Sequence, residues 1–223
     1  MGLDIVVCIK SVILAAPEEQ VLRTEDTSEL NPFDRPVLEA ALRLKEFHGG
    51  RVTAISMGPE TSLSALSEAR AMGVDREILI CDPALAGSDT LATSTALGAG
   101  LQKLVPFDLV LFGVRTADSD TGQVGPQTSV QLGIPFISMV FIMKWQKDVF
   151  RVERVADHFL KNMKSQRLRH LRSIPVLLSL GTWGFQGLAG HLSQSGSNAG
   201  AWRIWGLCRN GWVMRVPPPG CFP

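Results

Sequence analysis

The chain has 223 residues, of which 45% are hydrophobic and 19% charged, a balance typical of one globular domain with a sizeable core. The formal net charge is +1, but every Asp and Glu lies before residue 158, and the charged residues of 158–223 are all Lys or Arg. No apolar run reaches the roughly 20 residues that cross a bilayer, and the amino terminus has neither the basic start nor the long apolar stretch of a secretory signal. These features predict a cytoplasmic protein without membrane insertion.

Apolar runs alternate with helical patterns in the first part of the chain. Strands are predicted at residues 5–10, 51–57, 77–80 and 109–112. Helices are predicted to follow them over residues 37–47, 63–72, 91–101 and 127–132. Asn31 or Asp34 is expected to cap the first of these helices. The alternation favours an α/β fold with a mostly parallel sheet, right-handed crossovers and helices on both faces.

The pattern changes after Pro135. Residues 138–145 and 149–155 predict an antiparallel hairpin at the edge of the sheet, and a last strand is predicted near residues 174–180. We therefore expect a nucleotide- or flavin-binding domain over residues 1–180 and an irregular, atypical tail over residues 181–223. The tail is rich in Gly and Trp and has no acidic residue. Two alternative explanations fit this composition: a shifted reading frame near the end of the gene, or a basic tail that binds an acidic partner.

The turn over residues 113–126 is the most informative segment for function. It lies between a predicted buried strand and a predicted helix, where α/β sheets hold phosphate and ribose. Asp120 and Gln123 have the spacing of a capping box, and Gly122 permits close approach of the backbone to a ligand. The alternative is an ordinary capped turn between strand and helix.

A second turn, at residues 86–94, has the same character. The hydroxyl groups of Thr90, Thr93 and Ser94 lie at the predicted start of a helix, where they and the helix amides favour a diphosphate. Both turns follow strands of a parallel sheet, so both are expected at its carboxyl edge, the usual ligand site of such folds. Here too the alternative is a well-capped helix without a ligand.

Several enzyme signatures are missing. The sequence has no G-x-x-x-x-G-K-[ST], no G-x-G-x-x-G after the first strand, no G-x-S-x-G and no H-E-x-x-H. Its four cysteines form no C-x-x-C pair, and no histidine lies at metal-ligand spacing from another, so no metal site is predicted. A chain that holds a nucleotide without catalytic groups is expected to be a carrier, with the reactivity supplied by the cofactor.

Four segments carry a family resemblance. They are Val-Val-Cys-Ile-Lys at 6–10, Asn-Pro-Phe-Asp at 31–34, Ala-Met-Gly-Val-Asp-Arg at 71–76 and Asp-Ser-Asp-Thr-Gly-Gln-Val-Gly-Pro at 118–126. In this order they resemble the motifs of the beta subunit of electron transfer flavoproteins, and the match covers roughly residues 3–155. The resemblance implies a Rossmann-like (HUP) adenine-nucleotide-binding fold.

The resemblance also implies a function. The family's beta subunit forms a heterodimer with an alpha subunit and carries electrons between flavin dehydrogenases and other redox carriers. It binds AMP in the common form and FAD in the bifurcating and nitrogen-fixation forms. Residues 86–94 resemble the loop of the FAD-binding subgroup, so FAD is favoured over AMP here. The alternative function is a module that binds or senses ATP or AMP without a redox role. Nucleic acid is not an expected partner.

Cofactor-binding residues follow from the matched motifs. The resemblance places them at Cys8, Asn31, Pro32, Phe33, Asp34, Met57, Gly113, Val114, Arg115, Asp118, Asp120, Thr121, Gly122, Gln123 and Val124, in addition to Thr90, Thr93 and Ser94. Arg115 stands where the family usually has glutamine and adds a positive charge beside the ligand. No segment after residue 180 resembles the carboxyl-terminal motif with which the family's beta subunit docks on its partner.

Overall fold

The computed structural model describes residues 2–13, 24, 26–146, 149–156, 159–164, 176–180 and 212–214. The strands of its main sheet are β1 (Leu3–Cys8), β4 (Gly50–Met57), β5 (Arg76–Ile80), β6 (Leu109–Gly113), β7 (Phe136–Gln146), β8 (Val149–Ala156), β9 (Phe159–Lys164), β10 (Val176–Leu180) and β11 (Trp212–Met214). A separate pair, β2 (Ser11–Val12) and β3 (Glu29–Leu30), is antiparallel.

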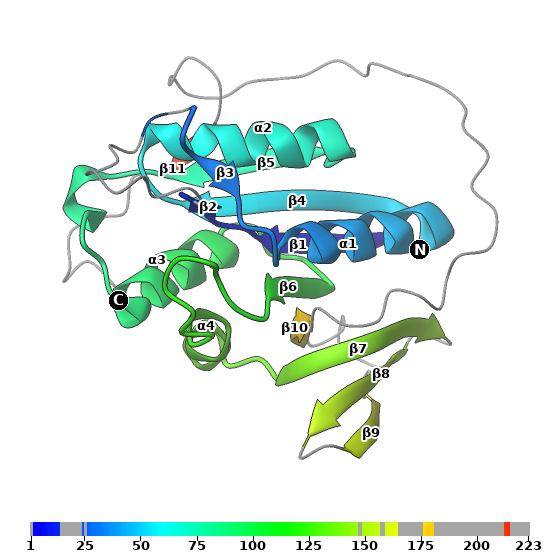
Figure 1. Cartoon of the computed structure of the whole chain (residues 1–223). Coiled ribbons are helices and arrows are strands. Elements are labelled where there is room, and N and C mark those ends of the chain that lie inside the picture. Colours follow the sequence, from blue (N-terminus) through cyan, green and yellow to red (C-terminus); the bar gives the residue numbers. More distant parts are fainter. Residues whose placement is uncertain are drawn as a thin grey trace.

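The strand order of the main sheet is β11-β5-β4-β1-β6-β10-β7-β8-β9 (Figure 1). All neighbours from β11 to β7 are parallel, whereas β7, β8 and β9 pair antiparallel. The central strands are nearly continuous buried apolar runs, as expected where helices cover both faces of a parallel sheet. The predicted α/β class with a mostly parallel sheet is confirmed.

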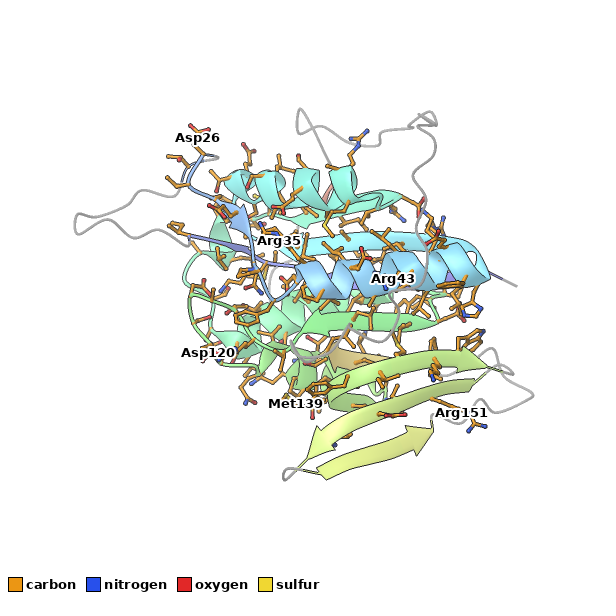
Figure 2. The ribbon with its side chains drawn as sticks, turned by 45° about the vertical axis from the view of Figure 1, so that its right-hand side comes forward. Asp26, Arg35, Arg43, Asp120, Met139 and Arg151 are labelled. Atoms are coloured by element: carbon orange, nitrogen blue, oxygen red, sulfur yellow. The ribbon has the colours of Figure 1, made fainter. Side chains whose placement is uncertain are left out.

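Helices cover the two faces of the sheet. They are α1 (Arg35–His48), α2 (Leu63–Met72), α3 (Thr90–Gln102) and α4 (Val124–Leu132), with short 3₁₀ turns at Glu60–Ser62 and Pro83–Leu85. One core contains Leu38 of α1 and Leu66 of α2, and a second core, on the other face, contains Leu97 and Leu101 of α3. Arg35, labelled in Figure 2, belongs to α1. Its Nε lies 2.7 Å from Glu68 Oε1 and joins α1 to α2.

Two predicted helix caps are wrong. Asp34 occupies the N-cap position of α1 without a side-chain capping bond, because its carboxylate and the Asn31 amide bond groups far along the chain. The predicted capping box at residues 120–123 does not form, since α4 begins at Val124 with Gln123 as an N-cap that makes no side-chain bond. The helix α3 is instead capped by Asp89, whose Oδ1 accepts a hydrogen bond from Ala92 N at 2.8 Å.

The predicted hairpin is present as β7 and β8, but it does not end the sheet. The unpredicted strand β9 pairs with β8 and continues the antiparallel part, and β10 enters between β6 and β7. Residues 181–211 and 215–223 of the predicted tail lie outside the described residues, so the division at residue 180 stays a prediction. None of the helices in the described part of the chain has the length and apolar content that a bilayer crossing requires.

Candidate functional site

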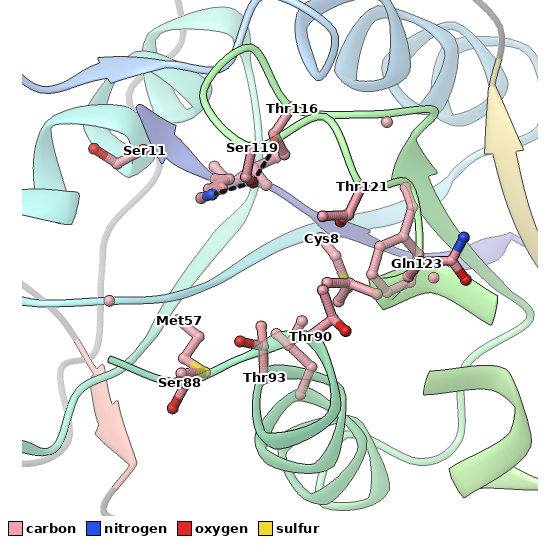
Figure 3. A pocket seen from close by; sticks show the side chains of 18 of the residues that line it. Cys8, Ser11, Met57, Ser88, Thr90, Thr93, Thr116, Ser119, Thr121 and Gln123 are labelled. Carbon is pink, nitrogen blue, oxygen red and sulfur yellow. Dashed lines mark hydrogen bonds between the residues drawn. The ribbon is translucent and has the colours of Figure 1, made fainter. Parts of the chain in front are cut away.

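A cavity of about 670 Å³ opens at the carboxyl edge of the parallel sheet, between the amino ends of α3 and α4 (Figure 3). The ends of β1, β4, β6 and β10 contribute Cys8, Met57, Gly113 and Ser179 to its wall. Its size is within the usual range for small-molecule sites, roughly 300–1,000 Å³. The two turns singled out in the sequence, about 30 residues apart, therefore face one space.

The predicted site residues fall into two groups. Those that line the cavity are Cys8, Asp34, Met57, Thr90, Thr93, Gly113, Arg115, Thr121, Gly122, Gln123 and Val124. Those outside its lining are Asn31, Pro32, Phe33, Ser94, Val114, Asp118 and Asp120. The structure thus brings most of them together and places the rest in a layer behind or beside the wall.

The α3 side of the cavity presents hydroxyl groups. Thr90 and Thr93 project from the first turn of α3 toward the opposite loop, with Ser88 beside them (Figure 3). The third predicted hydroxyl does not reach this space, because Ser94 is fully buried and donates to Leu91 O at 2.8 Å. An anion at this end would meet two threonine hydroxyls and the positive end of the α3 dipole.

The opposite side is the loop from Gly113 to the start of α4. Asp120 (φ 50°) and Gly122 (φ 60°) adopt left-handed backbone conformations, which fold the loop back toward α4. Asp120 lies at the end of the molecule where the cavity loops gather (Figure 2). No side chain caps α4, so its first turn offers a second helix amino end to a ligand.

Asn31 positions this loop rather than touching the cavity. Its side chain is completely buried, its Nδ2 donates to Arg115 O at 3.0 Å, and its Oδ1 accepts from Ala117 N at 3.2 Å. Its own backbone N–H donates to Lys10 O at 2.9 Å. Asn31 therefore ties the end of β1 to the loop that follows β6.

Replacing Asn31 by alanine is expected to lower the free energy of unfolding by about 2–3 kcal/mol, because two buried loop groups lose their partners. Urea unfolding measures this loss, and nucleotide affinity should fall with it as the loop loosens. The Gln102→Ala variant, at the exposed carboxyl end of α3 and outside the cavity lining, is the control and should change neither quantity by much. Equal behaviour of the two variants would contradict the role given to Asn31.

The two positively charged side chains of the cavity wall form ion pairs with predicted site residues that lie outside the lining. Lys10, which the sequence analysis missed, places Nζ 2.7 Å from Asp118 Oδ2. Arg115 places Nη1 3.3 Å from Asp120 Oδ2, and its guanidinium lies 4.6 Å from the ring centroid of Phe33. The signal for Lys10 was its place at the end of the first apolar run, on the carboxyl edge of the sheet.

The charge of Asp118 is stabilised by this arrangement. Burial alone would raise the pKa of Asp118, but hydrogen bonds from Lys10 and Thr116 and the positive charge of Lys10 together hold that pKa below its usual value. Ser119, whose Oγ is 2.9 Å from Thr116 Oγ1, completes this corner of the loop (Figure 3). Asp118 is thus a carboxylate at neutral pH.

Asp34 and Cys8 form a less polar part of the wall. Asp34 is 3% exposed, and burial raises the pKa of its carboxyl to about 7, although the hydrogen bond from Lys10 N at 2.8 Å opposes the rise. Burial, and then the charge of Asp34, hold the pKa of the Cys8 thiol well above its ordinary value, so the thiol is protonated at neutral pH. A Cβ on Gly113 would collide with Asp34 Oδ1, so this wall requires glycine.

The arrangement suits binding of an anion rather than a bond-making reaction. The uncapped amino end of α4, the hydroxyls of Thr90 and Thr93 and the side chains of Lys10 and Arg115 line the cavity. Within the described residues, no group of three or more His, Cys, Asp or Glu is arranged to hold a metal ion.

Comparison with known proteins gives consistent matches. Residues 20–171 match the electron transfer flavoprotein domain. The chain is 41% identical over 158 residues to "Electron transfer flavoprotein subunit beta" of Clostridium acetobutylicum, a match covering 68% of this chain and 61% of that protein. It is 36% identical over 187 residues to "Protein FixA" of Azotobacter vinelandii, covering 78% of this chain and 64% of that protein.

A third relative is "Acryloyl-CoA reductase electron transfer subunit gamma" of Anaerotignum propionicum, 35% identical over 161 residues. That match covers 69% of this chain and 60% of the relative. The chain therefore spans less than two thirds of the length of these curated relatives.

Proposed function

Because this chain belongs to the electron transfer flavoprotein family, among the beta subunits and FixA proteins, we propose that it is the small subunit of an electron-carrying heterodimer. Its partner would be an alpha subunit, and the heterodimer would carry electrons between flavin dehydrogenases and other redox carriers in the cytoplasm. The observation that carries the proposal is that the matched segment, residues 20–171, contributes most of the wall of the cavity. This chain would bind and position a cofactor and make no bond itself.

We propose that the cavity binds an adenine nucleotide, with FAD favoured over AMP. In FAD the phosphate of an AMP unit is joined to the phosphate of riboflavin phosphate, so FAD carries a diphosphate and needs anion sites along a longer path than AMP does. The cavity offers the uncapped amino end of α4 on one side and the hydroxyls of Thr90 and Thr93, at the start of the Asp89-capped helix α3, on the other. When bound, FAD would supply the one- and two-electron chemistry that these side chains cannot.

The chain's own residues would hold and shield this group. Thr90 and Thr93 would bind the diphosphate, and Thr121, Gly122 and Gln123 would face the nucleotide from the opposite loop. Asn31, Asp118 and Asp120 would act through the residues that they hold in place. Met57 and the protonated Cys8 thiol would give the adenine or ribose a largely apolar surface.

Cofactor content tests the proposal directly. The chain is co-expressed with its alpha subunit, the complex is denatured, and FAD and AMP are counted per heterodimer. Two flavins support FAD in this cavity, whereas one flavin with one AMP supports the common form of the family. A colourless protein that retains ATP or AMP would contradict the redox role and favour a nucleotide-sensing module.

A variant locates the diphosphate. Combining Thr90→Ala with Thr93→Ala should weaken FAD binding by about 2 kcal/mol, roughly thirtyfold in Kd, and AMP binding by less, because two hydroxyl bonds are lost. Thr95→Ala is the matched control, since Thr95 lies on the same helix but outside the cavity lining. Equal losses of FAD and AMP in the double variant would argue against a diphosphate at α3.

A further inference from the structure

The buried carboxyl group of Asp34 stands out among the charged groups of the cavity. Within the described residues it has no ion-pair partner within 4 Å, because the nearest ammonium group, Lys10 Nζ, lies 2.7 Å from Asp118 Oδ2 instead. Asp34 Oδ2 accepts the backbone N–H of Lys10 at 2.8 Å, and Oδ1 points at the backbone of Gly113. A negative charge at Asp34 is therefore stabilised by hydrogen bonds and by the charge of Lys10 through space, and not by a direct ion pair.

The groups around Asp34 make its charge sensitive to a ligand. Asp34 faces Cys8 at the end of β1 and Lys10 just after it, whose positive charge favours the carboxylate. From the loop after β6 it faces Asp118, whose negative charge disfavours a second carboxylate nearby. Arg115, on the same loop, pairs with Asp120, and Arg35, next in the chain, pairs with Glu68. A nucleotide brings the negative charge of its phosphate into the low-dielectric cavity that Asp34 lines, and this charge disfavours the carboxylate form of Asp34.

We propose that entry of a nucleotide phosphate into the cavity is coupled to uptake of one proton by the carboxylate of Asp34. The proton comes from solvent and converts the carboxylate into a neutral carboxylic acid, with no change in any other bond. The coupling rests on the proposed function, since it requires a nucleotide in this cavity. Asp34 thus acts as a charge compensator for the ligand, and affinity falls as rising pH makes the proton harder to acquire.

Proton uptake is measured by titration calorimetry of the nucleotide-free full-length chain with AMP at pH 7.5, in three buffers of different ionisation enthalpy. If the phosphate raises the pKa of Asp34 from about 7 to roughly 8, wild type takes up about half a proton more than Asp34→Asn. The difference between the two proteins is the readout, because the phosphate of AMP itself titrates near pH 6. Asp4→Asn, at the opposite end of β1, should match wild type.

The outcomes separate the two proposals. Equal proton uptake by wild type and Asp34→Asn, with AMP bound to both, would overturn the coupling and leave the proposed function standing. Absence of AMP and FAD binding to the wild-type chain would overturn the proposed function and the coupling together. If Asp34→Asn does not fold, infrared difference spectra of wild type decide, because the coupling requires the C=O band of a protonated carboxylic acid to grow when AMP binds, and a constant band overturns it.

Discussion

The Gly113→Ala variant should lose its bound nucleotide and about 2–3 kcal/mol of unfolding free energy. The added Cβ would collide with Asp34 Oδ1 and lie 3.2 Å from Phe33 O, and both belong to the tightly held entry of α1. To relieve this overlap, β6 and the loop after it must move away from β1. This movement would separate the residues that line the cavity. Urea unfolding and nucleotide content after gel filtration measure the two effects.

Gly98→Ala provides the matched control for this substitution. Gly98 lies inside α3, where an added Cβ would meet Gln131 Cβ at 3.4 Å, an ordinary contact, and alanine favours a helix over glycine by about 1 kcal/mol. The control should therefore be as stable as wild type or more so, and should keep its nucleotide. Normal stability and nucleotide content in Gly113→Ala would show that the wall at Asp34 is not closely packed.

The Asp34→Asn variant should remove a large pH dependence of stability. The folded-state pKa of about 7 exceeds the ordinary value of 3.8, so between these values the folded chain binds more protons than the unfolded chain. The stability linked to this group is complete below about pH 4 and is lost as the pH rises through 7. From pH 5 to pH 8, wild type should lose roughly 2–3 kcal/mol relative to Asp34→Asn.

Denaturant unfolding of both proteins across this range measures the difference. Wild type and Asp34→Asn share every other titrating group, so subtraction leaves the contribution of Asp34. Asp4→Asn retains Asp34 and should follow the pH dependence of wild type. Parallel curves for wild type and Asp34→Asn would mean that the Asp34 carboxyl is hydrated, and the charge compensation proposed for it would then fail as well.

The sequence predicted the strands and the ligand edge well because both depend on local signals. Apolar runs in the sequence predicted the strands β1, β4, β5 and β6. The alternation of strands and helices predicted a parallel sheet, and hence that the two polar turns lie at the same edge of it. Both turns line the same cavity, through Thr90 and Gly122 among others.

Two of the failures come from partners far along the chain, and one comes from a local bond within a helix. Asn31 was expected to cap a helix, but its side chain bonds residues 84 and 86 positions away. Ser94 was expected at the cavity, but its position on α3 turns its hydroxyl back to Leu91 O. The insertion of β10 between β6 and β7 has no local signature, because its neighbours are chosen by the packing of the whole sheet.

The position of β10 has a consequence for synthesis on the ribosome. Its residues, 176–180, emerge only after β7, β8 and β9 have left the exit tunnel, yet β10 alone joins β7 to the older strand β6. Until then the edges of β6 and β7 that β10 covers lack their hydrogen-bonded neighbour, and unpaired strand edges favour aggregation and chaperone capture. The binding wall, which includes Ser179, is consequently completed late in translation.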